Sequence, residues 1–269
     1  MELIIYLAIG AIAGFTAGLF GVGGGLIIVP ILYIVFRHQG YPSDVLMHLA
    51  LGTSLATIMV TSISSIMAHH KKKAVLWPVV KNLAIGLCLG SFLGAGVADL
   101  LPNYILQAVI GLFAMSVASK MYFNKKAEVD QSRTLPSALW QGGAGVGIGI
   151  ASAIFGIGGG SLTVPYLNRH GVVMQQAVAT SAACGFPIAV AGAIGFMWFG
   201  HHGSVNLPHA IGYVHVYAFI GISCMSFITA KLGAKLAHRL SPRGLQCCFA
   251  AMLCVVGCYF IVQALQQMR

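Results

Sequence analysis

The chain has 269 residues, of which 58% are hydrophobic and only 7% are charged, and its mean hydropathy is +0.88. A soluble surface needs far more charge, so the composition excludes a soluble globular domain and indicates an integral membrane protein. The formal net charge of +10 comes from Lys and Arg residues in short loops between apolar runs, which form no basic face. We therefore expect the lipid bilayer, and no nucleic acid, as a partner.

Apolar runs long enough to span a bilayer follow one another along the chain, because a membrane-spanning helix needs about 20 apolar residues. The clear candidates are 45–68, 76–99, 103–123, 172–200, 208–232 and 244–265. Two further segments, 2–37 and 134–168, are too long for single straight crossings and contain adjacent glycines. We expect each of these two segments to turn back inside the membrane.

These two segments carry the same motif. FGVGGG begins at Phe20 and precedes Pro30, and FGIGGG begins at Phe155 and precedes Pro165, an offset of 135 residues (155 − 20). Adjacent glycines and a proline interrupt a helix, so we interpret the glycines together with Pro30 and Pro165 as helix breaks. Matched interruptions in two halves of a membrane chain are typical of a transporter's substrate site.

The positive charges favour a topology in which both segments return to the side they entered. That topology puts 13 Lys and Arg residues on the cytoplasmic side and 2 outside, whereas single crossings would give 9 and 6. Both termini then lie on the outer side of the cytoplasmic (inner) membrane, in a multi-pass protein. Each half crosses an odd number of times, so the second half is inverted relative to the first.

We therefore predict an all-α integral membrane protein with an inverted-topology repeat. Each half has a broken, re-entrant, glycine-rich helical pair followed by three transmembrane helices. The predicted parts are a first repeat at 1–123, a cytoplasmic linker at 124–133 and a second repeat at 134–269.

The glycine motifs suit a small anion. Adjacent glycines let backbone N–H groups converge, and a helix that begins just after them adds about half a positive charge at its N-terminus. Segments 25–36 and 160–168 are the expected helices, and two such N-termini near the midplane could bind an oxyanion without a buried Lys or Arg. The predicted substrate contacts are Gly23, Gly24, Gly25, Thr53, Ser54, Gly158, Gly159, Gly160, Ser161, Thr180 and Ser181.

Structural interpretations of the same residues stay open. Small residues also let membrane helices approach closely, and Gly86, Gly90 and Gly94, at four-residue spacing, are expected to do only that. Ser and Thr side chains in membrane helices often bond to their own backbone. Ser161 has no hydroxyl counterpart in the first motif, where Leu26 stands, and is expected to make the site asymmetric.

Three residues are candidate accessory groups. Cys184 lies one helical turn after Thr180, His48 could carry a proton, and Lys81 could attract anions to the inner mouth. The seven cysteines have no metal-like spacing, and no carboxylate or cysteine accompanies the paired histidines, so we expect no metal and no cofactor. No nucleophile has a paired base, which argues against an enzyme.

The sequences FGVGGGLIIVPIL and FGIGGGSLTVPYL, spaced through two membrane halves, resemble the sulfite exporter TauE/SafE family of bacterial membrane transporters. The resemblance covers nearly the full chain, with a local departure at Ala74, where a glycine would be expected. It implies a permease for a small sulfur-containing anion such as sulfite, thiosulfate or an organosulfonate.

Alternating access is the expected mechanism, with one half rocking against the other around the paired breaks. The alternatives are an anion channel and a membrane protein that takes part in a sulfur-relay or redox step. A homodimer is compatible with the sequence.

Overall fold

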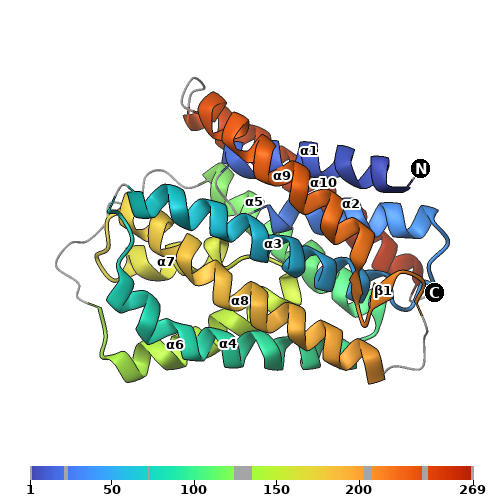
Figure 1. The fold of residues 1–269 in the computed structure, drawn as a ribbon, viewed down its shortest axis with the longest axis horizontal. Coiled ribbons are helices and arrows are strands. Elements are labelled where there is room, and N and C mark those ends of the chain that lie inside the picture. Colours follow the sequence, from blue (N-terminus) through green and yellow to red (C-terminus); the bar gives the residue numbers. More distant parts are fainter. Residues whose placement is uncertain are drawn as a thin grey trace.

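The computed structural model describes residues 2–20, 24–71, 73–123, 135–202, 207–237 and 242–267, and these are almost entirely α-helical (Figure 1). The predicted linker and Gly23 lie outside the described residues. The helices are α1 (Glu2–Phe20), α2 (Gly25–His38), α3 (Leu46–Lys71), α4 (Trp77–Leu100), α5 (Asn103–Phe123), α6 (Ala138–Phe155), α7 (Gly160–Arg169), α8 (Met174–His202), α9 (Val216–Ala237) and α10 (Pro242–Gln267).

Within the described ranges, the helices long and apolar enough to cross a membrane are α3, α4, α5, α6, α8 and α10. The prediction of an all-α integral membrane protein is confirmed at this level. The predicted span 208–232 is wrong at its start, because β1 (Ala210–Ile211) pairs antiparallel with β2 (Val214–His215) and α9 begins only at Val216. Gly212 has a φ of 55°, a left-handed conformation that suits a tight turn and not a helix.

The hairpin of α1 and α2 begins and ends at the same end of the molecule. Tyr6, in the first turns of α1, donates a hydrogen bond to Gln39, the residue after α2 (2.8 Å). Arg37, near the end of α2, donates to Gln263 near the end of α10 (2.8 Å). Figure 1 shows both chain termini and β1 at this end. Segment 2–37 therefore turns back, as its glycines predicted.

The hairpin of α6 and α7 is anchored at the opposite end. Asn82, near the start of α4, donates to Gln141 near the start of α6 (3.4 Å). At the same end, the backbone N–H of Leu76, just before α4, donates to Thr180 in the early turns of α8 (3.1 Å). Since α8 follows α7 after a short loop, α7 returns to the end at which α6 begins.

The main helix contacts join residues from different halves of the chain. α1 packs along α9, α4 along α6, α5 along α10, and α3 along α8. Figure 1 shows α4 and α6 side by side along one edge of the molecule, and α1 and α9 along the opposite edge, with α3 and α8 between them. The two halves are therefore interleaved.

Glycines make the α4–α6 contact a backbone-to-backbone one. Gly86 and Gly90 pack against the carbonyl groups of Gly142 and Val146, and a Cβ at Gly94 would lie 2.6 Å from the carbonyl oxygen of Ile150. Small residues are what such close helix approach requires. The packing interpretation of the four-residue glycine spacing on α4 is confirmed.

Candidate functional site

The two glycine motifs fold in the same way. Gly24 has φ 75° and ψ −23°, and Gly159 has φ 72° and ψ −21°, so each adopts the left-handed conformation that glycine tolerates and then begins a helix. The carbonyl of Gly24 accepts the N–H groups of Ile27 and Ile28, and that of Gly159 accepts the equivalent groups three and four residues on. The predicted helices at 25–36 and 160–168 are confirmed.

The prolines do not end these helices. Pro30 lies inside α2, which continues to His38, and Pro165 lies inside α7, which continues to Arg169. Each proline comes five residues after the first helical residue, where its missing N–H removes only one intrahelical hydrogen bond near a helix start. Neither proline therefore ends its helix, which corrects our interpretation of Pro30 and Pro165 as break residues.

The two breaks lie against each other. Gly25, the first residue of α2, packs on the carbonyl oxygen of Gly156, and a Cβ added there would lie 2.9 Å from the Cα of Ile157. The hydroxyl of Ser54 on α3 donates to the same carbonyl of Gly156 (2.9 Å). A Cβ at Gly158 would meet Ile58 of α3 at 2.7 Å. Residues of the first half thus surround the break of the second.

Three of the remaining predicted hydroxyls, those of Thr53, Thr180 and Ser181, have partners within the protein. Thr53 accepts the backbone N–H of His215 just before α9 (2.9 Å), as Thr180 accepts that of Leu76 just before α4. Both threonines are fully buried, and they join loops at opposite ends of the molecule. Ser181 donates to Val178 in its own helix (2.9 Å). The structure therefore brings Ser54, and not the two threonines, to the breaks.

Helix α7 carries a concentration of buried polar atoms without a hydrogen-bond partner in the described part of the chain. Four of nine such side-chain atoms belong to this one short helix. They are Ser161 Oγ, Thr163 Oγ1, Tyr166 Oη and Asn168 Oδ1.

Thr163 is a residue that the sequence did not single out. It is fully buried, and its Oγ1 lies 3.4 Å from the position that a Cβ on Gly159 would occupy, so the hydroxyl is directed toward the start of α7. The first motif has Ile28 at the equivalent position, and this difference between the two copies was the available signal.

A family model for the sulfite exporter TauE/SafE family matches residues 6–260. The chain belongs to this family. A probable membrane transporter protein of Haemophilus influenzae is 37% identical over 256 residues, which cover 95% of this chain and 96% of the relative. Probable membrane transporter proteins of Methanocaldococcus jannaschii and Bacillus subtilis are 29% and 30% identical, over 96% and 98% of this chain and 95% and 99% of their own lengths. No solved structure matches the chain.

This TauE/SafE protein is thus a multi-pass member of a membrane transporter family. The three residues that we predicted as accessory groups lie in different parts of the fold. Cys184 is fully buried and precedes Gly185, which packs on the carbonyl of Gly158 at the second break. His48 Nε2 bonds to the carbonyl of Ala98 (3.0 Å) at the end that holds both termini. Lys81 is exposed on the first turns of α4, at the other end. Only Cys184 lies beside a break.

No group of three or more His, Cys, Asp or Glu side chains that could hold a metal ion occurs among the residues that the structure describes. Lys81 near one end of α4 and Arg37 near one end of α2 are both exposed. The buried polar side chains of the described residues include no Lys or Arg. Within this part of the chain, an anion at the breaks would therefore be held by backbone N–H groups and neutral side chains, as in sites at helix N-termini.

Proposed function

We propose that this TauE/SafE protein is a permease that moves a small sulfur-containing anion, such as sulfite, thiosulfate or an organosulfonate, across the cytoplasmic membrane. The observation that carries the proposal is the contact between two matched helix breaks, at Gly25 and Gly156, inside a protein of a transporter family named for sulfite export. Each break begins a helix, and helix N-termini attract anions.

The proposed architecture is an inverted repeat. If the halves are exchanged, α1 corresponds to α6 and α9 corresponds to α4, so the α1–α9 contact becomes the α6–α4 contact. The α3–α8 and α5–α10 contacts map onto themselves. This exchange pattern, together with the nearly identical conformations of Gly24 and Gly159, supports a two-fold relation between the halves.

The proposed mechanism is alternating access, and the packing favours moving bodies other than the two sequence halves. Rocking one half against the other would separate α4 from α6 and α1 from α9, including the backbone contacts of Gly86 and Gly90. Motion of the α4–α6 pair relative to the α1–α9 pair would leave those contacts intact. The α3 and α8 helices, which lie between the pairs, would then carry the change across the breaks.

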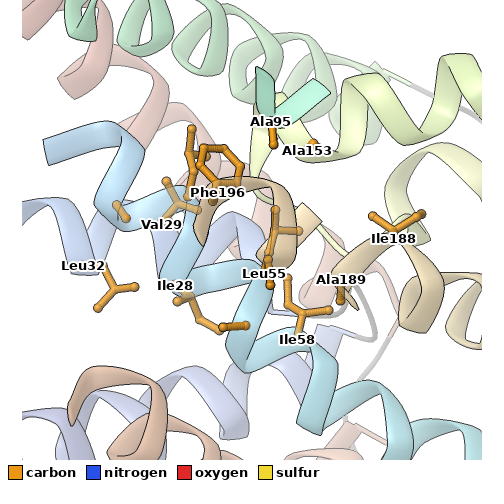
Figure 2. Close-up of a cluster of buried hydrophobic side chains, with 14 of the residues drawn as sticks. Ile28, Val29, Leu32, Leu55, Ile58, Ala95, Ala153, Ile188, Ala189 and Phe196 are labelled. Carbon is orange, nitrogen blue, oxygen red and sulfur yellow. The ribbon is translucent and has the colours of Figure 1, made fainter. Parts of the chain in front are cut away.

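The surroundings of the second break favour a carrier over an open channel. A Cβ at Gly158 would meet Ile58 at 2.7 Å, and one at Gly159 would meet Ile188 at 2.6 Å. Figure 2 shows Leu55, Ile58, Ile188 and Ala189 gathered in one buried apolar cluster. A channel needs a continuous polar path, whereas a carrier exposes its site to one side at a time.

The orientation proposed for the molecule follows the positive-inside rule. The end with Lys81 and the α6 start faces the cytoplasm, and the end with both termini faces outward. A reagent that labels single introduced cysteines only from outside the cell would label the C-terminus in this orientation, and the opposite labelling would reverse it.

The test is transport in proteoliposomes with radiolabelled sulfite and thiosulfate, using Gly159→Leu and Gly24→Leu variants. A leucine cannot adopt the φ of 72° at Gly159 without strain and would collide with Ile188, so we expect transport to fall by at least about tenfold. Gly147→Leu is the matched control, because nothing lies within 4 Å of a Cβ at Gly147. Folded break variants that transport at the wild-type rate would refute the site.

A further inference from the structure

Several buried polar atoms on α7 have no partner among the described residues, and such atoms need one. A buried hydroxyl that loses its water and finds no protein acceptor or donor costs about 1–3 kcal/mol. Among the described residues, Ser161, Thr163 and two further side chains of this ten-residue helix are in that state. Such a concentration on one short helix indicates a bound species that the described part of the chain does not supply.

The donors nearest the break converge on the start of α7. The backbone N–H of Gly160 donates to Gly158, and the carbonyl of Gly159 takes the N–H groups of Leu162 and Thr163. The N–H of Ser161 has no partner in the described part of the chain, and neither has its hydroxyl. Thr163 Oγ1 is directed back toward Gly159. Three hydrogen-bond donors thus stand unused at one helix N-terminus.

The first break lacks the two hydroxyl donors. Leu26 and Ile28 occupy the positions equivalent to Ser161 and Thr163, and both are almost completely buried in apolar clusters. The start of α2 is also covered by Gly156, because Gly25, the first residue of α2, packs directly on it. The two breaks share a backbone conformation and differ in the chemistry of the helix that follows.

We propose that the anion binds asymmetrically, at the start of α7, where Ser161 and Thr163 hold its oxygen atoms, while the start of α2 serves as packing. This inference rests on the proposed function and deepens it by naming the subsite. Several hydroxyl and amide donors suit a small oxyanion, because each donor can bond to a different acceptor oxygen. We therefore expect this subsite to bind an oxyanion more tightly than a halide. With neutral donors alone, the anion can also be released without breaking an ion pair.

The experiment measures anion binding to the purified full-length protein in detergent, by isothermal titration and by the rise in melting temperature. Sulfite and thiosulfate are the probes, and sodium chloride at equal ionic strength is the anion control. Thr163→Val keeps the shape and removes the hydroxyl, and Ser161→Ala removes the second one. We expect each variant to raise the dissociation constant for the oxyanion at least about tenfold.

Two matched variants separate a binding role from a structural one. Thr57→Val removes a fully buried hydroxyl that bonds to Ser54 in its own helix (2.7 Å), and it should leave the dissociation constant unchanged. Thr163→Ser keeps the hydroxyl and should retain binding even where Thr163→Val lowers the melting temperature.

The outcomes distinguish the two proposals. If the wild-type protein binds none of the oxyanions, the proposed function fails. If the wild type binds and both Thr163→Val and Ser161→Ala bind equally well, the proposed function stands and the subsite is overturned, with water as the partner of these hydroxyls. If Thr163→Ser binds as poorly as Thr163→Val, the hydroxyl is not the contact and the proposal is also overturned.

Discussion

Ser54→Ala should weaken the contact between the two breaks. The Ser54 hydroxyl is fully buried and donates to the carbonyl oxygen of Gly156 (2.9 Å), so it joins α3 to the end of α6. Hydrogen bonds between membrane helices contribute about 0.6 kcal/mol on average and about 1.7 kcal/mol at most. Since the buried carbonyl of Gly156 also loses a donor, we expect the free energy of unfolding to fall by about 1–2 kcal/mol. Equilibrium unfolding in mixed detergent and dodecyl sulfate micelles measures this change.

Ser62→Ala is the control for that measurement. The Ser62 hydroxyl donates to the carbonyl of Met59 in its own helix (3.0 Å) and makes no other hydrogen bond within the described part of the chain. Its removal should change the free energy of unfolding by less than about 0.5 kcal/mol. If Ser54→Ala destabilises the protein no more than Ser62→Ala, the hydrogen bond does not hold the breaks together, and the reasoning is refuted.

Three further changes have defined outcomes. Gly90→Ile places a Cβ against the backbone of Val146 and should lower the melting temperature strongly or prevent folding. Gly147→Ile is the control and should have neither effect, because nothing lies within 4 Å of a Cβ at Gly147. Equal effects of the two variants would contradict the backbone contact between α4 and α6. Thr53→Val and Thr180→Val should each lower the free energy of unfolding by about 1 kcal/mol, because each leaves a loop N–H without its acceptor. A large difference between the two variants in this free energy would argue against equivalent roles of the two threonines in holding their loops. Cys184→Ala should transport at close to the wild-type rate, and complete loss of transport would favour a sulfur relay instead.

The helix breaks were predictable because their cause is local. Adjacent glycines at 23–25 and 158–160 permit a backbone conformation that other residues resist, wherever the segment lies in the fold. The start of α9 was not predictable in this way, since 208–232 is mostly apolar and is typical of a span. The hairpin forms there because Gly212 fits against Met197 on α8, and that contact exists only in three dimensions.

The site was predictable only in part for a related reason. Duplication placed Thr53 and Thr180 in equivalent positions, but the acceptors and donors that each hydroxyl finds depend on which loops fold over it. A threonine inside a short helix, such as Thr163, ordinarily bonds to its own backbone. That its hydroxyl has no partner becomes visible only when every neighbour is placed.

The position of a bound anion is the most direct test of the proposed site at the breaks. It can be located by sulfur anomalous scattering at long wavelength, in crystals soaked with sulfite or thiosulfate. The sulfur atoms of the 11 methionines and 7 cysteines provide internal reference peaks. We expect one additional peak at the start of α7, with oxygens about 2.7–3.2 Å from donors of Ser161 and Thr163. An anion peak away from both breaks, or breaks separated by lipid, would contradict it.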